Sequence, residues 1–173
     1  MNVKEIILAG NPILKRVSDP IEDFSDLALS QLILDLFDSM RVHKGAGLAA
    51  PQIGVSKRII VYGFTHNPRY PKEKPIPDTV LINPEILEYS PETEEYYEGC
   101  LSLTNLRGLV PRSKSIIYKA RVPSGEEIQK EAYGFEARII QHETDHLDGI
   151  LFPSRMKDMS TLAMYVELLR QQQ

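Results

Sequence analysis

Apolar and polar residues repeat with two different periods along this chain, and the change of period separates predicted helices from predicted strands. Between residues 25 and 43, apolar side chains recur every three or four positions, at Leu29, Leu32, Ile33, Leu36, Phe37 and Met40. This spacing places them on one face of a helix, so the segment is predicted to be an amphipathic helix. We expect Ser25 to cap its N-terminus and Gly45 to help end it.

Shorter strand-like segments follow, separated by residues that favour turns. A buried strand is predicted at 58–63, and short strands at 79–83, 94–97, 115–122 and 127–133. The polar stretch 65–78 contains Pro68, Pro71, Pro75 and Pro77. Proline removes a backbone donor, so these four exclude a central strand or a helix interior, and we expect a surface insertion.

Two further helices are predicted near the end of the chain. The first runs from about 135 to 148 and is ended by Gly149. Its apolar residues, Phe135, Ile139, Ile140 and Leu147, point to several sides, which is typical of a buried helix. The second runs from 160 to about 170 and is expected to bury Leu162, Val166 and Leu169.

Composition narrows the class of protein. Hydrophobic residues make up 42% of the 173 residues and charged residues 25%, which are ordinary values for a globular chain. A net charge of −4 without a Lys/Arg block argues against nucleic acid as a partner. No stretch approaches the ~20 apolar residues that span a bilayer, and the start lacks the apolar run of a signal peptide. The single cysteine, Cys100, excludes an intramolecular disulfide and fits a reducing cytoplasm.

Residues 142–146 read His-Glu-Thr-Asp-His and carry the clearest chemistry. On a helix, His142 and His146 lie on the same face and could offer two imidazoles to one metal ion. Glu143 lies about 100° further round, where its carboxylate could reach a metal-activated water without ligating. This arrangement suits hydrolysis. The alternative is an exposed helix face with scattered polar residues, which the apolar flanks disfavour.

A catalytic site of this kind needs a third protein ligand, which the helix does not supply. The other donors are His43, His66, Asp145, Asp148 and the acidic run Glu92, Glu94, Glu95 and Glu98. The two histidines are expected at the surface, and the aspartates face away from the site or lie near the helix end. The first three glutamates suit a solvated strand edge. Cys100, just after a predicted strand, is the better candidate, although a lone cysteine is more often an inert buried hydrophobe.

Three motifs in order make the pattern more specific. They are residues 45–52 (Gly-Ala-Gly-Leu-Ala-Ala-Pro-Gln), 98–102 (Glu-Gly-Cys-Leu-Ser) and 141–149 (Gln-His-Glu-Thr-Asp-His-Leu-Asp-Gly). The set resembles the peptide deformylases, metallohydrolases that remove the formyl group from the N-terminal methionine of new bacterial and organellar proteins. The resemblance spans about residues 10 to 155.

The resemblance implies a metal site made of Cys100, His142 and His146, with water as the fourth ligand. It implies Fe(II) as the commonest metal, with Zn, Ni or Co able to replace it, because thiolate and imidazole suit several of these ions. Glu143 would act as the base. Gln52 and the backbone N–H of Leu101, with the metal, would stabilise the oxyanion.

The resemblance also implies substrate contacts, at Gly45, Gly47, Arg107, Phe135 and Ile139. The two glycines would let an extended peptide pair with their segment by strand addition. Phe135 and Ile139 would line a methionine pocket, but both could equally be ordinary core. The stem of Arg138 would form part of the pocket wall. Arg112 is expected to be structural and paired with Glu98.

We therefore expect an α+β fold, a single domain over residues 1–173, with antiparallel and mixed strands around the helix that carries the histidines. The expected reaction removes the formyl group from newly made N-formylmethionyl polypeptides in the cytoplasm and releases formate. The short last helix has no basic run, which gives no support for ribosome docking through a C-terminal extension. One rival is a metallopeptidase, which usually takes a third His or Glu ligand downstream. The other is a silent homologue that only binds, which would not need Glu143 and Gln52.

Overall fold

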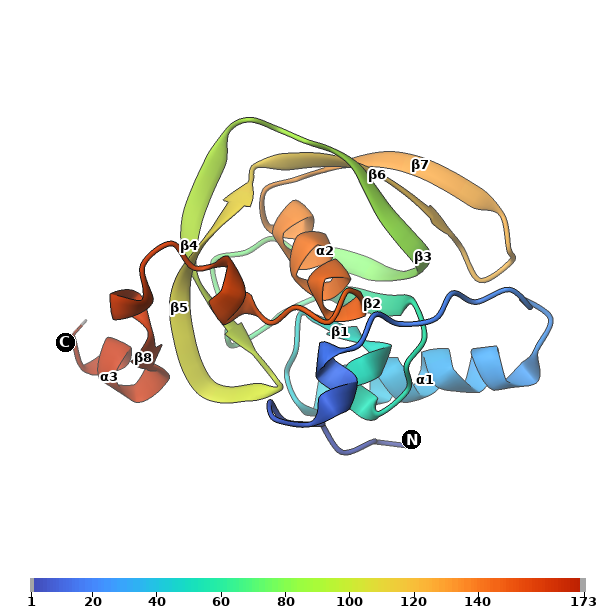
Figure 1. Ribbon diagram of the computed structural model, residues 1–173, viewed down its shortest axis with the longest axis horizontal. Coiled ribbons are helices and arrows are strands. Elements are labelled where there is room, and N and C mark those ends of the chain that lie inside the picture. The colour runs from blue at the N-terminus through green and yellow to red at the C-terminus, as the bar shows by residue number, and fades with distance from the viewer. Residues whose placement is uncertain (1, 172–173) are drawn as a thin grey trace.

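The computed structural model describes residues 2–171 and has an α+β fold with antiparallel sheets and few helices, as predicted (Figure 1). The strands are β1 (Gly47–Ala49), β2 (Ile59–Phe64), β3 (Ile76–Tyr89), β4 (Thr93–Cys100), β5 (Leu103–Ser113), β6 (Ser115–Arg121), β7 (Glu127–Tyr133) and β8 (Ala163–Met164). The helices are α1 (Leu27–Val42), α2 (Gly134–Leu147) and α3 (Tyr165–Arg170), with 3-10 turns at Pro12–Lys15, Ala50–Ile53, Phe152–Arg155 and Met159–Thr161. Within the described residues, one sheet has the order β1-β2-β3-β6-β7 and the other β4-β5-β8.

Helix α2 lies in the middle of the molecule, between the larger sheet and the β4–β5 hairpin (Figure 1). Its apolar residues Ala137, Ile140 and Leu147 pack in one cluster with side chains of β2, β3 and β6. The chain enters the helix at Gly134 and leaves it at Gly149, and both have a positive φ that glycine adopts without strain. The buried helix predicted from the sequence is therefore confirmed, with Gly149 just beyond its end.

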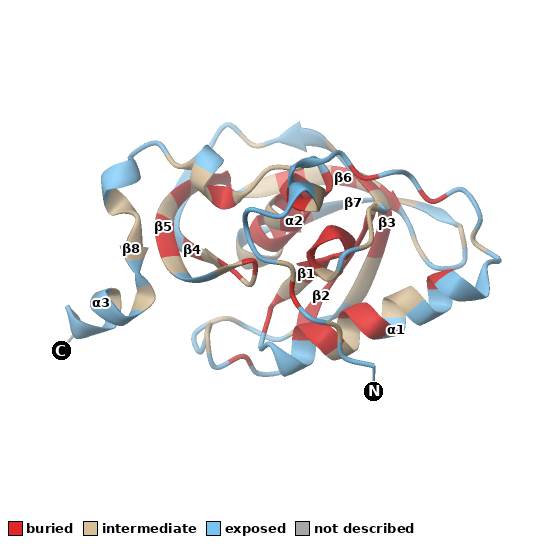
Figure 2. Cartoon of the chain, turned by 60° about the horizontal axis from the view of Figure 1, so that its bottom comes forward, coloured by how far each residue is buried: buried red, intermediate tan, exposed pale blue. Residues whose placement is uncertain are grey.

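Strand β2 separates two apolar clusters because its side chains alternate between the faces of the sheet. Ile60 and Tyr62 pack towards α2, whereas Ile59 and Val61 pack towards the apolar stripe of α1. Figure 2 shows that buried residues concentrate in β1, β2, α2 and the inner face of α1. Burial on both faces explains why β2 reads as a continuous apolar run.

The N-terminal cap of α1 differs from the prediction, whereas Gly45 helps to end the helix as predicted, although it is not the left-handed residue. Asp26, and not Ser25, caps the N-terminus, because its carboxylate accepts the Ala28 N–H at 2.8 Å. At the other end Lys44, and not Gly45, takes the left-handed conformation, with a φ of 55°. The N–H groups of Lys44 and Gly45 bond back to Arg41 and Met40, which is the Schellman pattern of helix termination.

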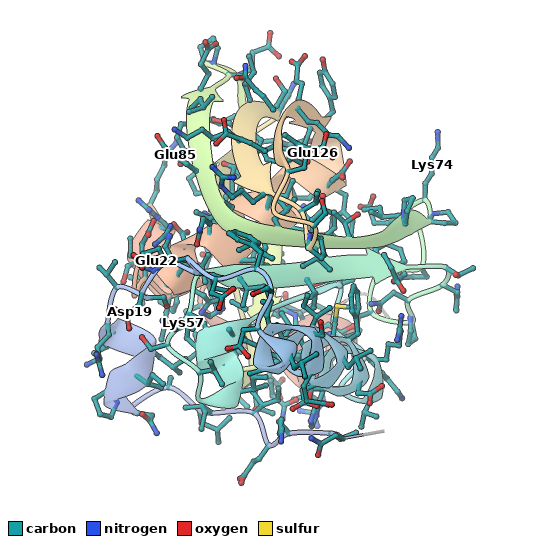
Figure 3. The ribbon with its side chains drawn as sticks, turned by 90° about the vertical axis from the view of Figure 1, so that its right-hand side faces the viewer. Asp19, Glu22, Lys57, Lys74, Glu85 and Glu126 are labelled. Carbon is teal, nitrogen blue, oxygen red and sulfur yellow. The ribbon has the colours of Figure 1, made fainter. Side chains whose placement is uncertain are left out.

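Strand β3 begins inside the proline-rich stretch, so the prediction of a loop throughout 65–78 is wrong at its end. Pro77 lies where the register of β2 against β3 shifts, between Tyr62 and Phe64. Pro84 lies at a second shift, between Ile82 and Glu85 in the pairing with β6. Interrupted pairing removes the need for a proline N–H, which is how a central strand carries both prolines. The remaining loop is exterior, and Lys74 points away from the protein in Figure 3.

The C-terminal part was also predicted incorrectly. Residues 160–170 do not form one helix, because the chain makes a 3-10 turn, pairs briefly with β5 as β8, and only then forms α3. Leu162 is half-buried, and Val166 and Leu169 are 49% and 43% exposed. The expected burial therefore fails for the last two, since α3 packs on the β5 edge of the fold. Every helix within residues 2–171 is too short or too polar to span a bilayer.

The N-terminal segment is tied to the three motif segments by backbone hydrogen bonds. The N–H groups of Ile7, Ala9 and Ser18 donate to the carbonyls of Gln52, Ser102 and Leu147, each at 2.8 Å. Further along, the backbone of Asp19 forms an isolated parallel β-bridge with that of Lys57, just before β2, and Figure 3 shows the two residues side by side. The segment thus fixes the relative positions of all three motifs.

Candidate active site

Three metal-binding side chains come together at the centre of the fold. The donor atoms of Cys100, His142 and His146 all lie within 4.8 Å of one another. Cys100 is the last residue of β4, and the two histidines occupy successive turns of α2. Cys100 Sγ lies 3.2 Å from His146 Nε2. The third donor therefore comes from the β4–β5 hairpin, whereas His43 and His66 are exposed.

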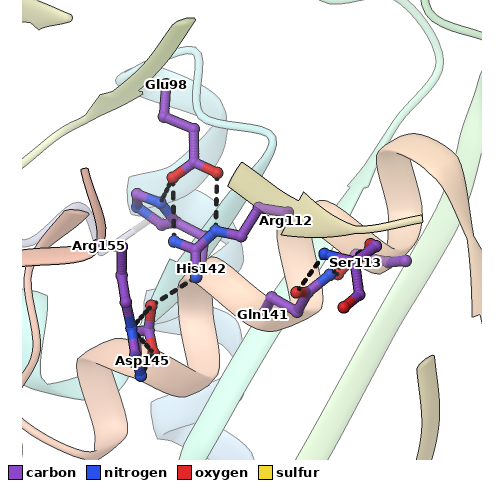
Figure 4. A network of polar contacts seen from close by, with 8 residues as sticks. Glu98, Arg112, Ser113, Gln141, His142, Asp145 and Arg155 are labelled. Atoms are coloured by element: carbon purple, nitrogen blue, oxygen red, sulfur yellow. Dashed lines mark hydrogen bonds and ion pairs between the residues drawn. The ribbon is translucent and has the colours of Figure 1, made fainter. Parts of the chain in front are cut away.

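Glu98 orients one of these histidines. Its Oε2 lies 2.9 Å from His142 Nδ1, which leaves Nε2 as the nitrogen available to a metal (Figure 4). Arg112 donates to both oxygens of Glu98, from Nε at 2.9 Å and Nη2 at 3.0 Å. Burial opposes ionisation of this carboxyl, but the His142 hydrogen bond and the Arg112 charge outweigh it and lower the pKa of Glu98 to about 2. The other acidic residues of the run, Glu92, Glu94 and Glu95, are exposed as expected.

Arg112 also joins the hairpin to α2. Its Nη1 donates to Asp145 at 2.6 Å, and Asp145 accepts a second arginine, Arg155, at 2.7 Å. On the same helix, the Gln141 amide bonds both the N–H and the carbonyl of Ser113 (Figure 4). These contacts hold β4 and β5 against α2, so the position of Cys100 relative to the histidines depends on them. The expected Arg112–Glu98 pair is thus part of a larger network.

Glu143 is buried beside the cluster with an unused acceptor. Its side chain is 5% exposed, and Oε2 has no hydrogen-bond partner among the described residues. Burial raises the pKa of Glu143, although the neighbouring histidines act in the opposite direction. A Cβ on Gly47 would lie 2.7 Å from Glu143 Oε1. The glycine in β1 therefore provides the space in which this carboxylate lies.

Gln52 presents its amide nitrogen to the cluster. Its Oε1 accepts the Ala49 N–H at 2.9 Å, which fixes the orientation of the amide. Its Nε2 lies 3.5 Å from Cys100 Sγ and 3.2 Å from Ser102 Oγ. Leu101 occupies the turn between β4 and β5 and lines the same cavity as Gln52. Two candidate donors thus border one space next to the cysteine.

The cavity in front of the cluster is lined by the expected substrate contacts and by residues that the sequence did not indicate. The expected ones are Gly45, Gly47, Phe135 and Ile139. The structure adds Arg69 and Tyr70 from the proline-rich loop, and the Tyr70 ring centroid lies 4.8 Å from that of Phe135. No periodicity in a proline-rich loop connects it to a site far along the chain, so sequence reasoning missed both residues.

Arg107, expected near bound peptide, does not line this cavity but the two beside it. Its guanidinium lies across the backbone of Gly99, where any Cβ would overlap it. Gly99 belongs to strand β4, and the close approach of Arg107 requires glycine at this position.

The donor set fits a divalent transition metal. One thiolate and two imidazoles are ligands for zinc, iron, nickel or cobalt, and three protein ligands leave a position open towards the cavity. Burial raises the pKa of Cys100, but the two imidazoles more than compensate and hold it well below its usual value. A buried Cys-His-His set beside an unpaired glutamate, facing a cavity, is an arrangement of the kind used by metallohydrolases.

Comparison with known proteins identifies the family. The sequence model of the polypeptide deformylase family matches residues 3–161. The chain is 48% identical over 169 residues to peptide deformylase 1 of Prochlorococcus marinus, covering 97% of this chain and 88% of that protein. It is 46% identical over 167 residues to peptide deformylase 1 of Bordetella pertussis, with coverage of 96% and 94%. The chain therefore belongs to the peptide deformylase family, whose enzymes remove the N-terminal formyl group from nascent peptides.

Solved structures agree with this assignment. The Met-Ala-Ser-bound class I type b peptide deformylase from Acinetobacter baumannii superposes with a TM-score of 0.87 at 40% identity, covering 90% of this chain and 100% of that one. The Thermotoga maritima peptide deformylase gives a TM-score of 0.82 at 37% identity, with coverage of 91% and 100%.

Proposed function

We propose that this enzyme is a metal-dependent deformylase in which Cys100, His142 and His146 hold one divalent ion, with Fe(II) as the native metal and Zn, Ni or Co as substitutes. We also propose that residues 1–173 act as a single catalytic domain. The observation that carries the proposal is the buried Glu143, whose Oε2 is unpaired next to the three donor atoms. A buried carboxylate without a partner is costly unless a ligand or water uses it.

The residues divide the reaction between them. When bound, the metal ion would activate water and polarise a carbonyl oxygen. Glu143 takes a proton from the attacking water and returns it to the leaving amine, first as general base and then as general acid. The Gln52 amide and the Leu101 N–H donate to the formyl oxygen as it gains negative charge. The C–N bond breaks, and the products are formate and a peptide with a free N-terminal methionine.

The substrate peptide would lie along β1. This strand is at the edge of its sheet within the described residues, with β2 as its neighbour on one side. An extended peptide can add to such an edge by main-chain hydrogen bonds, and Gly45 and Gly47 line the cavity beside it. The methionine side chain would then contact Phe135 and Ile139 in the cavity. The Acinetobacter baumannii relative, solved with Met-Ala-Ser bound, supports a peptide of this kind as ligand.

Neither rival function is supported by the contacts of this chain. A metallopeptidase would need a downstream ligand, but Asp148 pairs with Arg58, Asp158 caps a 3-10 turn and Glu167 pairs with Arg170. A protein that only binds would not require both Glu143 and Gln52 to face the cluster. We place the reaction in the cytoplasm, on N-formylmethionyl nascent polypeptides. The described part of α3 has no basic run to support ribosome docking.

The direct test is formate release from formyl-Met-Ala-Ser. Protein loaded anaerobically with Fe(II) or Ni(II) should release formate and free amine in equal amounts. The metal-free protein is the control. If loaded protein releases no more formate than this control, the proposed function is wrong.

A further inference from the structure

Three arginines border a second cavity that opens beside the active site. Arg69, Arg107 and Arg138 line a cavity of about 620 Å³ between the proline-rich loop, β4 and α3. Arg69 and Arg138, together with Tyr70, also line the cavity in front of the Cys-His-His cluster. The two spaces are therefore contiguous, and a peptide bound in the first can extend into the second.

Arg138 is buried without a carboxylate partner. It is 8% exposed, and its guanidinium carbon lies 3.9 Å from the Tyr96 ring centroid and 4.9 Å from that of Phe135. Over residues 2–171, no hydrogen bond or ion pair engages this guanidinium. Aromatic stacking holds its plane and leaves the edge N–H groups free to donate.

Arg107 is also buried, and it has no carboxylate partner among the described residues. It is 9% exposed, and its guanidinium carbon lies 4.4 Å from the Tyr165 ring centroid. Its Nη1 donates a hydrogen bond to the carbonyl of Leu106 at 2.8 Å. Burial and the charge of Arg69 both lower the pKa of Arg107. Arg112 gives the contrast, because it is equally buried but has Glu98 and Asp145 as partners. Buried charges are normally paired, so an unpaired set is costly unless a ligand supplies the anion.

The acidic residue that lines this cavity is Glu73, which is half-buried in the proline-rich loop. Three arginines and Lys72 against one glutamate leave the cavity with a positive balance, in a chain whose net charge is −4. The planar guanidinium group of arginine binds carboxylate and phosphate groups through paired N–H···O hydrogen bonds, and a peptide substrate can supply carboxylate side chains.

We propose that this cavity binds the carboxylate of an Asp or Glu side chain at the second or third residue of the formyl-methionyl substrate. The inference rests on the proposed function, because it needs the formyl group at the Cys-His-His cluster. Arg138 precedes His142 by four residues, which is about 6 Å along the helix axis. An extended peptide covers about 3.3 Å per residue, so its second and third residues lie within about 10 Å of the methionine, a distance at which they can reach the arginines that line both cavities.

The test compares peptides that differ only in charge. The formylated tripeptide amides are formyl-Met-Glu-Ser and formyl-Met-Ser-Glu, each with a Gln counterpart. Amidation removes the terminal carboxylate, so any preference belongs to the side chain. We expect kcat/KM about fivefold higher for Glu than for Gln at one of the two positions, from a lower KM, and a smaller ratio at high salt.

The variants assign the preference to the cavity. Arg138→Gln should reduce the Glu/Gln ratio of kcat/KM to below about twofold. Arg69→Gln, on the proline-rich loop, should also reduce this ratio, and it provides the test if Arg138→Gln folds poorly. Arg16→Gln is the matched control, since Arg16 is exposed and lines none of these cavities, and it should keep the full ratio.

Equal rates for Glu and Gln peptides in the wild-type enzyme would overturn the proposal. So would a preference that survives both cavity variants, or an arginine effect confined to peptides with a free C-terminal carboxylate. Failure of the proposed function is a separate result, because then the uncharged Gln peptides would release no formate either.

Discussion

At the scale of single residues, the absence of one Cβ determines how the candidate base lies. A Cβ on Gly47 would meet Glu143 Oε1 at 2.7 Å and Ile139 Cγ2 at 2.8 Å. Gly47→Ala should displace the carboxylate and lower kcat/KM by about tenfold or more, at a stability cost of about 1–3 kcal/mol. Gly45→Ala is the graded comparison, because its nearest contacts begin at 3.0 Å. Steady-state kinetics of the two variants should rank them in this order, and equal losses would contradict the argument.

Glu143→Gln separates proton transfer from metal binding. The amide keeps the shape of the side chain but cannot take a proton, so kcat should fall by about 100-fold or more. Because Glu143 is not one of the three clustered donors, the variant should retain its metal after dialysis. Metal content by elemental analysis and formate release are the two measurements. Turnover within a few-fold of wild type would rule out Glu143 as the base.

Sequence reasoning at this scale found residues whose chemistry is unusual for their surroundings. His142 and His146 are readable from their spacing, and Cys100 follows once a third ligand is sought. Gln52 became a candidate only through the resemblance to deformylases, because a loop amide has no local signal. Arg69 and Tyr70 could not be found, since their position depends on how the proline-rich loop folds over α2.

At the scale of elements, α2 is held against the β4–β5 hairpin by a buried ion-pair network. Arg112→Met would leave Glu98 and Asp145 without their common partner, and we expect a loss of about 3–5 kcal/mol of unfolding free energy. Arg155→Met is the control, because its side chain is 45% exposed and Asp145 would keep Arg112. Urea denaturation of the metal-free proteins measures both. A loss as small as that of the control would show that the network contributes little.

The contact between the N-terminal segment and α1 should depend on pH. Burial works to raise the pKa of Asp35, but hydrogen bonds from Gln31, Lys4 and Asn2 outweigh it and lower the pKa below its usual 3.8. A lowered folded-state pKa means that the stabilisation is complete above about pH 4 and is lost as pH falls through the folded-state value.

Asp35→Asn tests this directly. Wild type should be more stable than the variant in urea at pH 6, and the difference should shrink as pH falls below the ordinary aspartate pKa. A difference that stays constant from pH 6 down to pH 3 would contradict the contribution of the Asp35 charge.

Elements were predictable where one periodicity continues without interruption. The stripe of α1 and the apolar run of β2 give both elements, because packing follows their period. Strand β5 was missed because buried Arg107 and Arg112 break its apolar pattern and Gly108 and Pro111 resemble turn residues. Strand β3 was shortened because Pro77 is normally excluded from a central strand, and only the register shift reveals why it is tolerated.

At the scale of the whole molecule, the α+β class follows from the mixture of the two periods, but the crossing of β4–β5 over α2 does not. That arrangement depends on contacts between residues far apart in sequence, such as Cys100 with His146 and Gln141 with Ser113. Ordinary strand and helix patterns do not encode which hairpin meets which helix face. The three motifs indicated that these segments meet, because a metal site needs its third ligand.

Metal removal should therefore weaken the whole fold and not only its activity. An ion held by Cys100, His142 and His146 would join the end of β4 to two turns of α2, so it stabilises the native state over the unfolded chain. At a free metal concentration of 100 times Kd the gain is about 2.7 kcal/mol, which raises Tm by about 5–10 °C for a chain of this size. Thermal unfolding with Ni(II) and with chelator measures the difference. Cys100→Ser should lose most of this shift, because an alcohol is a poor ligand for these metals, whereas the exposed variant His43→Ser should keep it. A full shift in Cys100→Ser would mean that the metal binds elsewhere, and the proposed ligand set would have to be abandoned.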